Sequence, residues 1–211
     1  MKKTGLVILV LLSLSITLLP DSTQIKFEHI SITDGLSQNT VNCILQDSKG
    51  FMWFATEDGL NKYDGYDFSI YDSDPDDPGT ININYVWTIY EDRFGTLWVG
   101  TWGGGLNRFD RANECFTHYI NEPDNTHSLS HNEVRAICED QSGKLWIGTK
   151  GGGLNKFDPY LGRFKHYRHD PENPFSLSGD EVMCLCADRG GRLWVGTRTA
   201  GLNRFDPSRE Y

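Results

Sequence analysis

The chain has 211 residues, a formal net charge of −9 and a pI near 5.1. This length favours one domain or part of a larger one. The acidic balance, with no basic run beyond Lys2-Lys3, argues against nucleic-acid binding, which needs a positive surface to replace counterions.

The first residues have the pattern of an export signal. Lys2-Lys3 precede an apolar run from Gly5 to Leu19, which is shorter than the roughly 20 residues that span a bilayer. We therefore predict a secretory signal peptide at 1–23. An uncleaved N-terminal anchor is the alternative, because no small-x-small cleavage site is clear. In either case we expect residues 24–211 to be periplasmic.

One segment recurs four times along the rest of the chain. Its most regular copy joins Gly143 to Thr149 with Gly151 to Asp158. Each copy holds a tryptophan, with spacings of 45, 48 and 48 residues: Trp53, Trp98, Trp146 and Trp194. A valine stands twelve residues before each of them: Val41, Val86, Val134 and Val182. A period in the forties indicates an array of similar units that pack on one another.

The third repeat shows the elements of one unit in chain order. A β-prone segment begins at Val134, an aspartate–glycine turn covers 140–143, and an apolar strand covers 145–149. Alternating segments then follow near 154–157 and 164–167. Four short antiparallel strands at this period predict a blade of a β-propeller. The predicted fold is all-β, with blades at about 40–72, 85–120, 133–168 and, incomplete, 181–211.

Residues 25–32 complement the incomplete last repeat. Phe27-Glu28-His29-Ile30 matches the outer-strand sequences Phe116-Thr117-His118-Tyr119 and Phe164-Lys165-His166-Tyr167, yet no inner strands precede it. An orphan first strand that completes the last blade would close a propeller without a free edge. Four repeats allow a closed four-bladed ring or the opening portion of a larger ring, and we expect the larger ring.

The stretch from Asp140 to Asp158 carries the pattern of a known repeat. Its aspartate turn, Leu-Trp-Ile-Gly-Thr strand and Gly-Leu-Asn-Lys-Phe-Asp segment resemble the two-component regulator propeller family. The blocks at 92–110 and 188–206 match nearly as well, whereas the first repeat departs from the pattern at Phe54-Ala55-Thr56.

That resemblance implies the periplasmic sensor region of a membrane-bound two-component regulator of the hybrid histidine kinase type. In the family, a seven-bladed propeller precedes a small β-sandwich, a membrane helix and a kinase. Characterised relatives sense glycan breakdown products. The resemblance therefore implies a small ligand, such as an oligosaccharide, and downstream domains of the same protein as partners. This chain has no kinase sequence, so we expect no catalytic activity in it.

Two positions of the repeat vary within constant surroundings. After the constant threonine stand Glu57, Trp102, Lys150 and Arg198, and before the repeat valine stand Tyr85, Glu133 and Glu181. Strand direction brings both sets to the loop-bearing face of the propeller. We predict that they contact the ligand; plain solvent exposure is the alternative. The repeat tryptophans are predicted to be structural, because large aromatic side chains wedge adjacent blades together.

No cofactor or metal site is predicted. The cysteines lack zinc-finger spacing, and Cys43, Cys138, Cys184 and Cys186 fall at strand positions typical of small core residues. The aspartate-rich stretch 72–77 lacks the glycine and glutamate of an EF-hand loop, so we interpret it as a connector.

Two other functions stay open at this stage. One is a stand-alone exported binding or scaffold protein that closes as four blades. The other is a lyase-like propeller enzyme, although His29, His118 and His166 share one outer-strand position, which favours a structural role. The sequence does not decide whether the chain forms a homodimer.

Overall fold

A computed structural model describes residues 25–206. The predicted signal peptide at 1–23 lies outside these residues. The described part is all-β apart from one 3-10 turn, Ile32–Asp34. Its strands are β1 (Val41–Gln46), β2 (Met52–Thr56), β3 (Leu60–Tyr63), β4 (Phe68–Tyr71), β5 (Val86–Glu91), β6 (Leu97–Thr101), β7 (Leu106–Asp110), β8 (Cys115–Tyr119), β9 (Val134–Glu139), β10 (Leu145–Thr149), β11 (Leu154–Asp158), β12 (Arg163–Tyr167), β13 (Val182–Ala187), β14 (Leu193–Thr197) and β15 (Leu202–Phe205).

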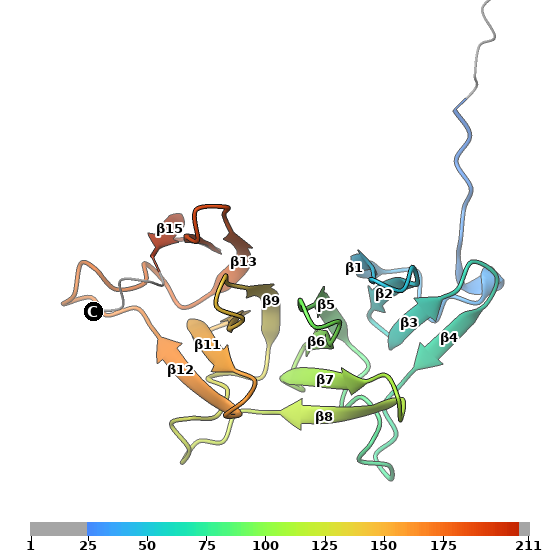
Figure 1. Ribbon diagram of the computed structural model, residues 1–211, viewed down its shortest axis with the longest axis horizontal. Helices are drawn as coiled ribbons and strands as arrows, with labels where there is room; N and C mark the ends of the chain where they lie inside the picture. Colours follow the sequence, from blue (N-terminus) through green and yellow to red (C-terminus); the bar gives the residue numbers. More distant parts are fainter. Residues whose placement is uncertain (1–24, 207–211) are drawn as a thin grey trace, which may run out of the picture.

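These strands form four antiparallel sheets, one for each repeat. Blades 1 to 3 have the orders β1-β2-β3-β4, β5-β6-β7-β8 and β9-β10-β11-β12, and blade 4 has β13-β14-β15. Figure 1 shows β1, β5, β9 and β13 turned toward a common axis, with β4, β8 and β12 at the periphery. The predicted β-propeller fold is therefore confirmed.

An aspartate–tryptophan hydrogen bond recurs in every blade. The indole Nε1 of Trp53, Trp98 and Trp146 donates to the aspartate six residues earlier at 2.8 Å, and that of Trp194 does so at 3.0 Å. The other oxygen of the same carboxylate accepts backbone N–H groups of the turn, as from Ser142 and Lys144 to Asp140. The Asp-x-x-Gly turn thus fixes the second strand and satisfies its buried indole.

Hydrophobic cores lie between successive blades. The rings of the first three repeat tryptophans contact the phenylalanine of the next blade's third strand edge-on, at 5.3–5.5 Å between centroids: Trp53–Phe109, Trp98–Phe157 and Trp146–Phe205. All three tryptophans are at most 1% exposed. These contacts support the predicted wedging role of the tryptophans, since edge-on aromatic pairs add to the stabilisation from buried apolar area.

The two terminal blades are less covered than the two central ones. Ile89 and Ile137 of the inner strands β5 and β9 are 5% and 8% exposed, whereas Ile44 at the same place in β1 is 60% exposed. In β13, Cys184 and Cys186 are exposed and not in a core as predicted. The face that carries them points away from blade 3, and no further blade covers it among residues 25–206. Cys138, at the matching place in β9, is buried against blade 4, and this burial raises the pKa of its thiol to about 12.

Residues 25–31 do not form the predicted outer strand in this structure. Ile25 and Phe27 are more than four-fifths exposed. Ser31 caps the 3-10 turn that follows. The physical reason is that the open strand edge lies on blade 4, whereas Figure 1 shows this segment leaving the molecule beside β4 of blade 1.

Candidate functional site

The variable positions predicted from the repeats are joined in pairs by backbone hydrogen bonds. The N–H of Trp102 donates to the Tyr85 carbonyl at 2.9 Å, and the N–H of Lys150 donates to the Glu133 carbonyl at 3.0 Å. In blade 4 the N–H of Arg198 donates to the Glu181 carbonyl at 2.9 Å. Each pair extends the ladder between the first and second strands beyond their regular pairing. The scaffold thus presents two variable side chains per blade at the same end of the inner strands.

Side chains from blades 2 and 3 meet there in one cluster. We call Tyr85, Trp87, Trp102, Glu133, Arg135 and Lys150 the mouth cluster. The rings of Tyr85, Trp87 and Trp102 lie 5.3–6.1 Å apart between centroids. Lys150 Nζ lies 4.5 Å from the Trp102 ring centroid and 3.1 Å from Glu133 Oε2. Aromatic faces and charged groups of both signs are therefore within reach of one small ligand.

Arg135 is the buried cation of the mouth cluster. Its guanidinium carbon lies 4.2 Å from the Trp87 centroid and 4.4 Å from the Trp102 centroid, and its side chain is 6% exposed. Its nearest carboxylate is Glu133, at 3.9 Å. Its Nε has no hydrogen-bond partner among residues 25–206. A buried donor without a partner costs free energy, so Arg135 can offer hydrogen bonds to a bound molecule.

The three remaining predicted residues lie beside this cluster in two different ways. Glu57 of blade 1 accepts a hydrogen bond from the Tyr85 hydroxyl at 2.9 Å, which joins blade 1 to the mouth cluster. Burial, followed by this carboxylate, raises the pKa of Tyr85, so its hydroxyl stays protonated and donates. Arg198 and Glu181 form their own ion pair in blade 4 at 2.9 Å. A backbone bridge between Lys150 and Glu181 joins this pair to the mouth cluster.

Sequence reasoning missed Trp87 and Arg135. Both stand directly after the repeat valine, where Asn42 and Met183 stand in the other blades. This position also varies in size and charge between the repeats. The criterion used for the other candidates, variation within constant surroundings, would therefore have found it. A bulge begins strand β5, where the pairing shifts between Val86 and Thr88 and leaves Trp87 without a partner on β6.

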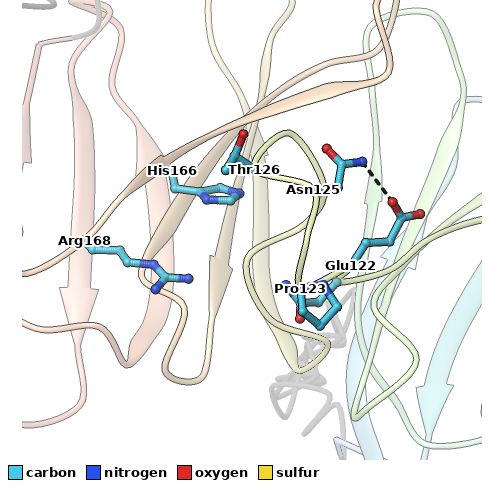
Figure 2. A pocket seen from close by; sticks show the side chains of 7 residues that line it. Glu122, Pro123, Asn125, Thr126, His166 and Arg168 are labelled. Carbon is cyan, nitrogen blue, oxygen red and sulfur yellow. Dashed lines mark hydrogen bonds between the residues drawn. The ribbon is translucent and has the colours of Figure 1, made fainter.

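A hollow lies at the periphery, away from the inner strands and from the mouth cluster. It has a volume of about 410 Å³ and is formed by the connector 121–126 together with β12 and Arg168. Figure 2 shows Glu122 hydrogen-bonded to Asn125, with His166 and Arg168 on the facing wall. His166 already contacts the Ser128 carbonyl through Nε2 at 2.7 Å, which is the structural role expected for the outer-strand histidines. None of the predicted ligand-contacting residues lines this hollow.

Residues 25–206 contain neither a cluster of metal-binding side chains nor a membrane-crossing helix. No group of three or more histidine, cysteine, aspartate or glutamate side chains is placed to hold a metal ion within that range. Its one helical segment is a 3-10 turn of three residues, and no helix there is long and apolar enough to cross a membrane.

The repeats match a known family model. Residues 35–58, 80–103, 128–151 and 176–199 each match the two component regulator propeller model. The chain is therefore a β-propeller protein built of two-component regulator propeller repeats, as the sequence resemblance predicted. It belongs, through these four repeats, to the two-component regulator propeller family.

Similar proteins come from two-component systems. Histidine kinase P4 of Formosa agariphila is 40% identical over 83 residues, which are 39% of this chain and 6% of that protein. The extracellular domain of the hybrid two component system BT3049 from B. thetaiotaomicron superposes with a TM-score of 0.77 at 29% identity, over 86% of this chain and 25% of that domain. Virginiamycin B lyase from Staphylococcus aureus, at 16% identity and a TM-score of 0.55 over 79% of this chain and 55% of that one, shares only the fold. The chain thus spans a small part of the two-component relatives that it resembles.

Proposed function

We propose that this chain is the ligand-sensing propeller portion of an exported, membrane-anchored two-component regulator of the hybrid histidine kinase type. The family repeats and the likeness to extracellular domains of hybrid two component systems support this placement. Ligand binding on the periplasmic side would change how the blades pack, and the downstream domains of the full protein would transmit that change to the kinase. Those downstream domains are also the proposed partners.

The ligand of this proposal is an oligosaccharide held at the mouth cluster. The observation that carries it is the buried Arg135 guanidinium, which lies between Trp87 and Trp102 with an unpartnered Nε. Aromatic faces suit the apolar side of a sugar ring, while Arg135 and Lys150 suit hydroxyl or carboxylate groups on its edge. Tyrosine, tryptophan and arginine are also the residues that contribute most often to binding energy.

The test is a fluorescence titration of the chain with neutral and uronate-bearing oligosaccharides. We expect saturable quenching, because Trp87 and Trp102 are only partly buried. Trp102→Ala should weaken binding at least about tenfold, which corresponds to roughly 1.4 kcal/mol. Tyr66→Ala is the matched control, since Tyr66 is an aromatic residue that is 89% exposed elsewhere. Equal affinity of the two variants would place the ligand away from the mouth cluster.

A further inference from the structure

A serine–asparagine pair joins the segment leading into the blade to the blade's third strand in blades 1, 3 and 4. In blade 3 the N–H of Ser130 donates to Asn155 Oδ1 at 3.0 Å, and Asn155 Nδ2 donates to Ser130 Oγ at 2.8 Å. The same two hydrogen bonds, at 2.7–3.0 Å, occur in the pairs Ser37–Asn61 and Ser178–Asn203. Both polar ends of the asparagine amide are therefore satisfied in these three blades.

Blade 2 differs because Asn82 stands at the serine position. Asn82 Nδ2 donates to the carbonyl of Gly104, in the turn between β6 and β7. Asn107 of β7, which matches the asparagine of the other blades, donates from Nδ2 to the Val99 carbonyl at 3.4 Å. The Oδ1 atoms of Asn82 and Asn107 are both buried, and neither accepts a hydrogen bond from a residue in 25–206.

Rotating an amide does not remove this defect. Each of the two amide nitrogens donates to a backbone carbonyl, so a rotation by 180° would place one oxygen against another. A buried acceptor without a donor costs free energy, and a partly satisfied polar network costs more than a complete one. The arrangement in the structure therefore gains the Gly104 hydrogen bond but leaves two acceptors unpaired.

Asn82 also has the groups that the serine uses in the other blades. Its backbone N–H can donate to Asn107 Oδ1, and its own Oδ1 can accept from Asn107 Nδ2. Both unpaired oxygens would then be satisfied, and the Gly104 carbonyl would be released toward solvent. Two arrangements thus compete in blade 2, one with Gly104 and one with Asn107 as the partner of Asn82.

We propose that Asn82 switches between these two partners, and that the change moves Trp102 within the mouth cluster. Trp102 stands two residues before Gly104, and a Cβ added at Gly104 would clash with the Asn82 side chain, so the turn and Asn82 are in direct contact. Gly103 and Gly105, with φ of +109° and +78°, flank that position and let its peptide groups reorient.

This switch would give the proposed sensor a two-state element at its ligand site. The Trp102 ring contacts the rings of Tyr85 and Trp87, so a displaced Trp102 changes the aromatic surface that a ligand meets. A ligand that binds one form of this surface more tightly shifts the population toward that form. Only this last step rests on the proposed function, because the exchange of partners itself requires no ligand.

The first test is NMR relaxation dispersion on the whole chain without ligand. We expect exchange on the microsecond-to-millisecond timescale at the amides of Gly104 and Gly105 and at the Trp102 indole N–H. Gly152 and Gly153 occupy the same turn of blade 3 and should show no such exchange, because Ser130 has one arrangement. Flat profiles for blade 2 overturn the proposal. Equal exchange in both turns also overturns it, since glycine flexibility would then be the cause.

The second test replaces the residue that has two partners. Asn82→Ser should remove the exchange at Gly104 and Trp102 and raise the thermal unfolding midpoint by about 2–4 °C, because the buried acceptors become paired. Ser130→Asn is the converse variant and should introduce exchange at Gly152. Exchange at Gly104 that survives Asn82→Ser, or a Ser130→Asn variant without exchange at Gly152, contradicts the proposal.

Asn82→Ala separates the switch from a merely unfavourable side chain. Alanine lacks the acceptor that pairs with Asn107 Nδ2, so this variant should raise the unfolding midpoint less than Asn82→Ser does. An equal gain from the two variants would show that losing the Gly104 contact stabilises the blade, and not pairing with Asn107, which overturns the proposal. None of these measurements depends on the ligand, so their failure is distinct from a failure of the proposed function.

Discussion

The two ends of each blade differ in how they use the repeat. At the turn between the first and second strands, all four blades keep the same aspartate and tryptophan, hydrogen-bonded at 2.8–3.0 Å. At the opposite end, the residues that follow the constant threonine are acidic, aromatic or basic according to the blade. The first end packs buried aromatic rings between blades, whereas the second carries side chains whose identity differs from blade to blade. In the proposed function, stability and recognition therefore depend on opposite ends of the same strands.

One substitution made at both ends gives the largest expected contrast. Trp146→Ala removes a fully buried ring that contacts Phe205 of the next blade, so it should cost about 3–5 kcal/mol of unfolding free energy. Trp102→Ala, in the mouth cluster, should cost less than about 1 kcal/mol. Urea unfolding followed by circular dichroism would measure both. Similar costs for the two variants would mean that the mouth cluster is part of the scaffold.

The end of each blade that carries the aspartate–tryptophan turn could be predicted from the sequence, because the same local interactions recur in every repeat. Asp140, Gly143 and Trp146 recur at fixed offsets, and short-range turn chemistry with antiparallel pairing determines where they lie. The variable positions such as Trp102 and Lys150 could be predicted as one face, because strand direction alone places them there. Their partners could not, because contacts such as Arg135 with two tryptophans join different blades and depend on the bulge in β5.

The ends of the chain were the least predictable part. The match of 27–30 to an outer strand is evident in the sequence, but the sequence does not say which sheet edge is within reach. Similarly, the apolar pattern of β13 predicts buried cysteines, yet Cys184 and Cys186 are exposed because burial depends on a neighbouring blade. Local patterns specify a blade, whereas its environment comes from other blades.

A second contrast compares a central blade with a terminal one. A Cβ added at Gly148 would clash with Cγ1 of Val182 in the next blade, whereas one added at Gly196 would clash only with Sγ of Cys184 in its own blade, at 2.5 Å. Gly148→Ala should therefore cost about 1–3 kcal/mol by overpacking the blade interface. Gly196→Ala should cost less, since the exposed cysteine can rotate away. Thermal unfolding of the two variants would check this order, and equal losses would show that the blade interface tolerates the added methyl group.

The smallest expected effect is an acid sensitivity of the aspartate–tryptophan end. Burial alone would raise the pKa of Asp140, but hydrogen bonds from Ser142, Trp146 and the Lys144 backbone outweigh it and hold that pKa below its usual value. Because the folded pKa is the lower one, this stabilisation is complete above the unfolded value of about 3.9 and is lost as the pH falls toward the folded pKa. The effect should be smaller than that of Gly148→Ala, because burial opposes the hydrogen bonds and only the difference between them lowers the pKa.

Asp140→Asn isolates this contribution. The amide keeps an acceptor for the Trp146 indole but places an NH₂ group against the turn's backbone donors, so the variant should be less stable by about 1 kcal/mol at pH 6. Between pH 4 and pH 3 its urea midpoint should fall less steeply than that of the wild type, because one carboxylate with a lowered pKa is gone. Parallel curves for the two proteins would mean that Asp140 titrates alike in the folded and unfolded chains. The turn would then stabilise the blade through its backbone geometry and not through the charge that all four repeats share.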